Sequence, residues 1–342
     1  MKKLKFTLVV LLILVGKLSL GQDPQFSQFF SSPLNINPAL TAHINADWRF
    51  ISNIRDQWIG PASPYITGTA SYDRKIFQNK IPNVDNSDDN VFGIGGMLMY
   101  DYSMSGIQKS TYGSMDVSYN VKFAEGNVAK HRLGLGFGTT YGRRYVDFNR
   151  LYFQDQWIGY NGFNTNLPNN ESALSEMKPW FSVSTGVLYN FYTEKSNLDM
   201  GVAVFHVNKP KQTFLEDENQ FLPMRKVAHL NFETFINDQT VFNFNTIYQF
   251  QKEAKYYSVG AALGYYVGNT QDVLVNGGFW YWSKNAIIPY AGVAYGDMQF
   301  GVSFDITTSK LNQAAKKPGT WELSLIIRGS NKPTNIIPCP WR

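Results

Sequence analysis

Few residues of this 342-residue chain have the types and spacing that catalysis or metal binding requires. The sequence contains no HExxH, paired CxxC or GxSxG motif. Its four histidines are far apart in the sequence: His43, His131, His206 and His229. We therefore predict a protein without enzyme activity, without a cofactor and without catalytic or metal-binding residues.

One cluster of acidic residues consists of Asp85, Asp88 and Asp89. Clustered carboxylates are suitable ligands for Ca²⁺, but the spacing and the glycine of an EF-hand loop are missing here. We therefore favour a solvated turn over a cation site. The one cysteine, Cys339, has no partner for a disulfide within the chain, and we expect a free or buried thiol.

Three glycines, Gly134, Gly136 and Gly138, alternate with larger residues. A spacing of two places all three on one face of a strand, whereas a dinucleotide-binding loop requires a different pattern. We interpret them as positions that leave room for lumenal side chains or for a plug.

The elements that must position any site are strands with two different faces. In one segment Val117, Tyr119 and Val121 alternate with Ser118 and Asn120, which is the period of a β-strand. The same alternation recurs in residues 133–142, 181–191, 242–251 and 321–328. Bulky apolar residues opposite small or polar ones are typical of a membrane barrel, although a soluble β-sandwich gives the same period.

The number of strands favours the barrel. The pattern predicts 14 strands, over residues 46–57, 65–75, 91–102, 111–124, 131–146, 179–192, 198–207, 226–237, 241–251, 256–267, 273–283, 286–295, 298–307 and 320–328. Bacterial single-chain barrels have an even number of strands, which returns both termini to the periplasmic side. We therefore expect an all-β, antiparallel outer-membrane barrel over residues 46–328.

The lengths of the connections support this orientation. Short connections, at 193–197, 237–240, 268–272 and 296–297, fall on the predicted periplasmic side. Long ones, at 147–178, 208–225 and 308–319, fall on the outer side, as in outer-membrane barrels. The exception is the long segment 76–90, which this count places on the periplasmic side.

The start of the chain resembles an export signal. Residues 1–21 combine a basic beginning, a short apolar run and small residues, so we predict a signal peptide that is cleaved after Gly21. Its four lysines account for most of the net charge of +5, and the remainder carries +1. An aromatic fraction of 15% with only 17% charged residues suits a wall that faces lipid.

Four segments outside the predicted strands are candidates for partner contacts. Residues 22–45 and 329–342 are rich in proline or asparagine, so we expect periplasmic tails or lumen-filling segments. The long outer connections 147–178 and 208–225 would form one docking surface. The first of them contains aromatic residues within 151–158, which are typical of interaction sites but could instead pack on the barrel mouth. The candidate partner-binding residues are Tyr152, Phe153, Trp157, Phe26 and Phe29.

Several segments together resemble the PorP/SprF family of Bacteroidota outer-membrane proteins. They are residues 22–29 (QDPQFSQF), 33–40 (PLNINPAL), Arg49, 53–58 (NIRDQW), 71–73, 201–206 (GVAVFH), 278–280, 285–288, 300–305, 321–325 and 337–340 (IPCP). The resemblance covers nearly all of the chain after the signal, and the block at 22–29 is its most specific part.

The resemblance implies a role in type IX secretion and gliding motility. It implies a non-enzymatic barrel in the cell outer membrane that helps to export, anchor or carry a surface adhesin. Its partners would be the adhesin's C-terminal secretion domain and periplasmic or peptidoglycan-associated components. Two alternatives remain: a channel for a small solute, and a soluble secreted β-protein such as an adhesin or lectin.

Overall fold

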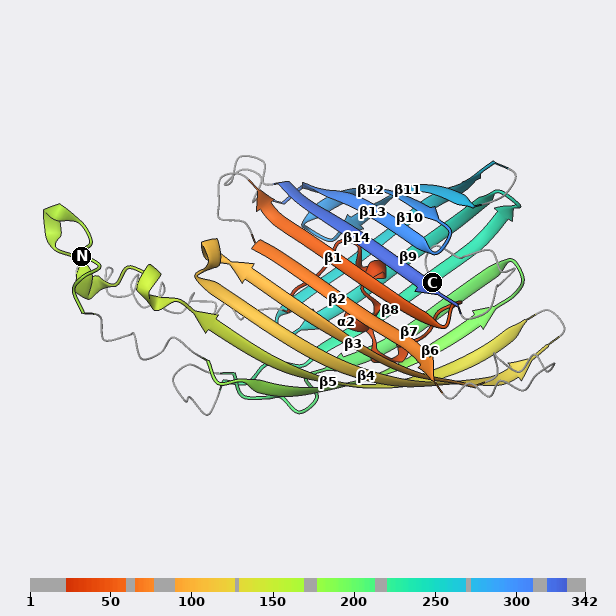
Figure 1. Cartoon of the computed structure of the whole chain (residues 1–342), viewed down its shortest axis with the longest axis horizontal. Helices are drawn as coiled ribbons and strands as arrows, with labels where there is room; N and C mark the ends of the chain where they lie inside the picture. Colours follow the sequence, from red (N-terminus) through yellow and green to blue (C-terminus); the bar gives the residue numbers. More distant parts are fainter. Residues whose placement is uncertain are drawn as a thin grey trace, which may run out of the picture.

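The chain forms one closed barrel of fourteen antiparallel strands (Figure 1). The computed structural model describes residues 23–59, 65–76, 90–126, 129–168, 177–212, 220–268, 272–309 and 319–330. Each strand pairs with its sequence neighbours, and β1 closes the barrel against β14. The predicted all-β barrel is therefore confirmed. The predicted signal peptide, the cluster at Asp85, Asp88 and Asp89, and Cys339 lie outside the described residues.

Every strand end lies within three residues of its predicted position. The strands are β1 (Trp48–Ile59), β2 (Tyr65–Ile76), β3 (Asn90–Ser103), β4 (Gln108–Glu125), β5 (Lys130–Val146), β6 (Trp180–Tyr192), β7 (Ser196–Phe205), β8 (Arg225–Asn237), β9 (Thr240–Gln251), β10 (Ala254–Val267), β11 (Val273–Trp282), β12 (Ala286–Tyr295), β13 (Met298–Thr307) and β14 (Gly319–Gly329).

The two faces of the strands divide as the alternation predicts. On β4, Met115 and Tyr119 are exposed on the outer surface, whereas Asp116, Ser118 and Asn120 are buried on the lumenal side. In a lipid bilayer the outer apolar side chains contact hydrocarbon, and the closed ladder leaves no unpaired strand edge. This arrangement explains how a wall with so few charged residues is stable.

Both termini of the barrel lie at the same end. Asp47, just before β1, donates its backbone N–H to the carbonyl oxygen of Gly329 at the end of β14. We assign this end to the periplasm, because it carries the short connections between β6 and β7, β8 and β9, and β12 and β13. The opposite, outer end carries the long connections from β5 to β6 and from β7 to β8.

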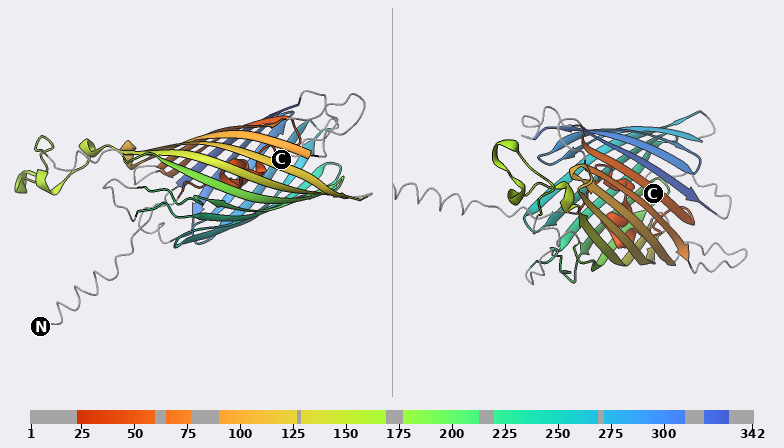
Figure 2. Two further views of the ribbon diagram at one scale, coloured as in Figure 1. Left: turned by 90° about the horizontal axis from the view of Figure 1, so that it is seen from below. Right: turned by 60° about the vertical axis from the view of Figure 1, so that its left-hand side comes forward.

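Residues 23–46, which we call the lumenal segment, fold inside the barrel, where Figures 1 and 2 show them in red between the strands. They contain η1 (Phe29–Ser31), α2 (Pro33–Ile36) and η2 (Pro38–Leu40), and a proline begins each of the last two. Among the described residues, no helix is long and apolar enough to span a membrane.

Candidate functional site

Apolar side chains of the lumenal segment pack against the barrel wall. Phe29 and Ile36 are buried in a cluster with wall residues that include Phe205 and Trp280. The ring of Phe30 lies 4.8 Å from that of Trp280, measured between centroids. Burial of each large side chain of this kind stabilises the packed state by about 1.5–3 kcal/mol. The lumenal segment therefore forms part of the hydrophobic core of the barrel.

A cluster of charges holds the start of the lumenal segment. Both carboxylate oxygens of Glu322 on β14 accept backbone N–H groups, from Ser27 at 2.7 Å and from Gln28 at 2.8 Å. Arg55 on β1 donates to Glu322 at 3.0 Å and to Asp305 at 2.8 Å. We call Ser27, Gln28, Arg55, Asp305 and Glu322 the Glu322 cluster.

The side chain of Gln28 extends the same cluster. Its amide donates to Ser303 Oγ at 3.1 Å and to the backbone oxygen of Glu322 at 2.9 Å, and it accepts from Ser324 Oγ at 2.7 Å. Side chains of three neighbouring strands thus bind two consecutive residues of the lumenal segment. Removing one member of a buried charge cluster leaves the others unpaired, which typically costs about 3–5 kcal/mol.

Glycines allow the middle of the lumenal segment to approach the wall. A Cβ at Gly136 would overlap the backbone of Pro38 and Ala39, and a Cβ at Gly186 would overlap the Asn37 side chain. Asn37 donates to the carbonyl oxygen of Val187 at 3.1 Å. The interpretation of the glycine series as space for a plug therefore holds at Gly136. At Gly134 and Gly138, the added Cβ would instead meet lumenal side chains of the wall.

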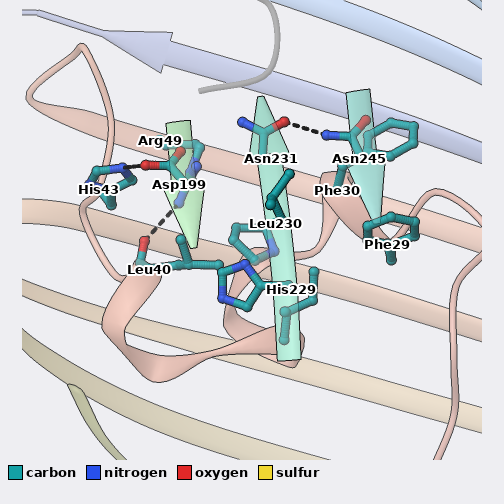
Figure 3. A pocket seen from close by; sticks show the side chains of 12 residues that line it. Phe29, Phe30, Leu40, His43, Arg49, Asp199, His229, Leu230, Asn231 and Asn245 are labelled. Atoms are coloured by element: carbon teal, nitrogen blue, oxygen red, sulfur yellow. Dashed lines mark hydrogen bonds and ion pairs between the residues drawn. The ribbon is translucent and has the colours of Figure 1, made fainter. Parts of the chain in front are cut away.

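The end of the lumenal segment is also bound by charged side chains (Figure 3). His43 Nε2 lies 2.8 Å from Asp199 Oδ1 on β7. Arg49 on β1 forms an ion pair with Asp73 at 2.8 Å, and Asp73 also accepts the backbone N–H of Ala42 at 2.7 Å. Here the lumenal segment and the wall enclose a cavity of only about 50 Å³.

Asp23, the first described residue of the chain, is held at the outer end of the barrel by side chains of the wall. Its carboxylate lies 2.8 Å from His206 Nε2 and 3.1 Å from Arg225 Nε, and its backbone N–H donates to Gln251 at 3.1 Å. Burial alone would raise the pKa of Asp23. The charges of His206 and Arg225, with hydrogen bonds from His206 and Gln251, outweigh burial and hold this pKa well below its usual range.

The lumenal segment consequently runs from the outer end to the periplasmic end of the barrel. Asp23 contacts His206 just beyond β7, at the outer mouth, whereas Asp47 contacts Gly329 at the periplasmic end. Polar side chains of the wall bind the segment at both ends, whereas its middle approaches wall glycines and a backbone carbonyl. The lumen is therefore occupied along its length by the chain's own N-terminal residues.

A second candidate site projects from the outer end. Residues 147–168, which we call the outer segment, extend beyond the strands at the left of Figure 1. The segment includes η4 (Phe148–Arg150), η5 (Gln154–Gln156) and η6 (Gly159–Asn161). Its base is tied to the β3–β4 connection, where Arg150 donates to the carbonyl oxygen of Ser105 at 2.9 Å.

The outer segment presents aromatic rings to solvent. Tyr152 is 66% exposed and Trp157 is 53% exposed, and both rings contact Phe163, at centroid distances of 5.1 and 4.8 Å. Tyr160, between Trp157 and Phe163 in the sequence, is fully exposed. In Figure 1 the segment extends away from the barrel mouth and does not fold back over it. Its aromatic side chains therefore do not pack on the mouth.

A model of the type IX secretion system membrane protein PorP/SprF family matches residues 18–327. The chain belongs to the PorP/SprF family. This membership and the barrel fold confirm the resemblance seen in the sequence and the location in the outer membrane. Comparison with individually curated proteins found no match.

Several solved structures are similar to this PorP/SprF member at low identity. The Ralstonia pickettii toluene transporter TbuX is 11% identical with a TM-score of 0.42, over 87% of this chain and 94% of that chain. The Pseudomonas putida toluene transporter TodX is 11% identical with a TM-score of 0.45, over 86% and 92%. CdiB from Acinetobacter baumannii is 8% identical with a TM-score of 0.44, over 82% and 60%.

The structure separates the predicted partner-binding residues of this PorP/SprF chain into two groups. Tyr152 and Trp157 are exposed on the outer segment, and Phe153 is half-buried there against Phe148. Phe26 and Phe29 are buried inside the barrel, so a partner cannot reach them while the lumenal segment stays in place. The two groups therefore do not form one site.

Sequence reasoning did not identify the residues that hold the lumenal segment. Arg55, Asp305 and Glu322 come from strands far apart in sequence, and no short motif brings them together. A signal was nevertheless present, because each is a charged residue on the lumenal face of an alternating strand. Within the described residues, no group of His, Cys, Asp and Glu side chains is arranged to hold a metal ion.

Proposed function

We propose that this PorP/SprF chain is a non-enzymatic docking barrel. In this proposal it binds the C-terminal secretion domain of a surface adhesin, and so helps the type IX machinery to export, anchor or carry it. The outer segment makes the contact with the adhesin, while the lumenal segment keeps the barrel closed. Periplasmic components would be met at the opposite end of the barrel. Residues 77–89 and 331–342 lie outside the described part of the chain.

The observation that carries this proposal is the exposed aromatic cluster of the outer segment. Tyr152, Trp157 and Phe163 are held together by ring contacts, yet each remains about half or more exposed. Aromatic side chains that are already ordered lose little conformational entropy on binding, and they are enriched among the residues that contribute most to interfaces. The cluster lies beyond the strand ends, where a partner has free access.

The filled lumen supports docking over solute transport. The lumenal segment packs on the wall with charged, polar and apolar contacts. Two of the cavities it lines measure about 50 Å³ each, and a larger one of about 370 Å³ lies at the outer mouth. A conducting pore of fourteen strands needs a continuous water-filled lumen instead. The channel alternative would therefore require the lumenal segment to leave the barrel.

Site-specific crosslinking tests the docking proposal. A photoreactive amino acid at position 160, on the fully exposed Tyr160, should crosslink to a secreted surface protein in intact cells. The same group at position 295, where Tyr295 is exposed near the periplasmic end, is the matched control and should not capture that protein. Equal capture at both positions, or none at position 160 in cells that produce the adhesin, would contradict the proposal.

A further inference from the structure

A polar cavity opens at the outer mouth of the barrel, beside the lumenal segment. Its volume is about 370 Å³, within the range of about 300–1,000 Å³ that small-molecule sites occupy. It lies at the outer ends of β9, β10 and β11. Its walls include Gln25, Gln249, Gln251, Tyr256, Trp282 and Asn285.

Two aromatic rings form one wall of this cavity. The rings of Tyr256 and Trp282 lie 5.2 Å apart between centroids and are tilted by 45°. The guanidinium of Arg55 lies 5.1 Å from the centroid of the Trp282 ring and helps to fix its position. Ordered aromatic faces provide an apolar surface against which the C–H groups of a sugar ring can pack.

Side-chain amides form the remaining wall. Gln25, Gln249, Gln251 and Asn285 each carry both donors and acceptors, which suits hydroxyl groups that donate and accept at once. The Gln249 side chain is buried, and its Oε1 accepts a hydrogen bond from the Tyr256 hydroxyl at 3.3 Å. This bond fixes the amide wall and the aromatic wall relative to each other.

The charges around the cavity balance. Glu253 and Lys255, one acidic and one basic, are its only formally charged wall residues among those described. A site built for a strongly anionic or cationic ligand would present an excess of the opposite charge. The combination of amides, aromatic rings and balanced charge therefore favours an uncharged ligand rich in hydroxyl groups.

We propose that this cavity binds a neutral saccharide at the cell surface. The lumenal segment forms part of the site, because Gln25 belongs to it and Gln251 also binds Asp23 through both amide atoms, at 3.1 and 3.4 Å. Saccharide binding therefore requires the lumenal segment to be in place. This inference does not depend on the docking role of the outer segment.

Binding of the full-length protein in detergent to an array of defined oligosaccharides tests the proposal. The array carries neutral hexose, deoxyhexose and N-acetylhexosamine chains together with acidic glycans and short peptides. At least one neutral oligosaccharide should bind saturably. Its affinity, measured by calorimetry, should fall about tenfold or more in Gln249→Leu and in Trp282→Leu, the loss expected for about 1.4 kcal/mol.

A control variant and a second site variant separate binding from folding. Gln239→Leu lies in the periplasmic turn between β8 and β9 and should bind like the wild type. Asn285→Ala removes one amide from an outer turn and should weaken binding while the barrel keeps its heat-modifiable mobility on gels. The proposal is overturned if no neutral oligosaccharide binds, if all variants bind equally, or if acidic glycans or peptides bind in its place.

Discussion

The backbone N–H of Gln28 donates a 2.8 Å hydrogen bond to Oε1 of Glu322, a residue 294 positions away in the sequence. This bond joins the lumenal segment to the strand that closes the barrel against β1. Because Ser27 binds the other oxygen of the same carboxylate, the Glu322 side chain is fully occupied by the lumenal segment and Arg55. A buried network of hydrogen bonds and ion pairs therefore joins the lumenal segment to the barrel wall.

The substitution Glu322→Gln should destabilise the barrel. It removes the negative charge that faces Arg55 and replaces one acceptor with a donor, which we expect to lower the free energy of unfolding by about 3 kcal/mol. Urea unfolding in detergent, followed by tryptophan fluorescence, measures this change. The control Ser303→Ala removes one hydrogen bond from Gln28 and should cost about 1 kcal/mol. Equal losses in both variants would contradict the assigned role of the carboxylate.

The substitution Gly186→Ala should displace the lumenal segment. The added Cβ would overlap the Asn37 side chain, so residues 37–39 would have to move away from the wall. We expect proteinase K to cleave within residues 23–46 faster than in the wild type. The control Gly277→Ala places its Cβ 3.7 Å from the nearest atom, in ordinary contact, and should remain resistant. Resistance in both variants would show that the approach at Gly186 does not constrain the segment.

The contact of Asp23 at the outer mouth should weaken in acid. Because its pKa in the folded protein is depressed below the usual value of 3.8, its stabilising contribution is complete above that value and is lost as the pH falls through the folded pKa. A nitroxide attached to Gln25→Cys, in a Cys339→Ser background, should therefore gain mobility only below about pH 4.

The variant Asp23→Asn tests the source of this pH dependence. Without the carboxylate, the same nitroxide should already be mobile at pH 7 and should change little as the pH falls. An unchanged acid transition in Asp23→Asn would mean that another group controls the outer end of the lumenal segment.

Removing the lumenal segment should open the barrel. The wild-type protein should show almost no conductance in a planar bilayer, because residues 23–46 fill the lumen. Deletion of residues 22–45, with the signal peptide retained, should produce a steady ion current. A wild-type current of the size given by the deletion variant would favour the channel alternative.

The strand pattern could be predicted from the sequence because each strand alternates locally. The strands β12 and β13 were predicted with their observed bounds. Departures occur where local backbone geometry overrides the alternation. The prediction extended β7 to residue 207, but the strand ends at Phe205, because His206 adopts a positive φ of 57° and turns toward Asp23. The pattern predicts that β4 begins at residue 111. The strand begins at Gln108 instead, because residues 108–110 also pair with β5.

The lumenal contacts could not be predicted, because they join residues that are distant in sequence. Nothing in the sequence near Gln28 or Glu322 indicates that they meet. Whether residues 22–45 form a periplasmic tail or fill the lumen can be decided only from the three-dimensional structure of the closed barrel. Several residues that carry the family resemblance, including Arg49, Arg55 and Asp73, turn out to bind the lumenal segment or each other beside it. The residues that carry the family resemblance therefore lie at contacts with the lumenal segment more often than in the outer segment.

Affinity purification from detergent-solubilised outer membranes tests the docking account most directly. A tagged wild type is compared with the double variant Tyr152→Ser, Trp157→Ser and with the control Tyr295→Ser, whose ring is similarly exposed at the other end. Mass spectrometry should recover a secreted surface adhesin with the wild type and the control, and at least tenfold less of it with the double variant. Equal recovery from all three proteins, or recovery of the barrel alone from membranes that contain the adhesin, would contradict the account.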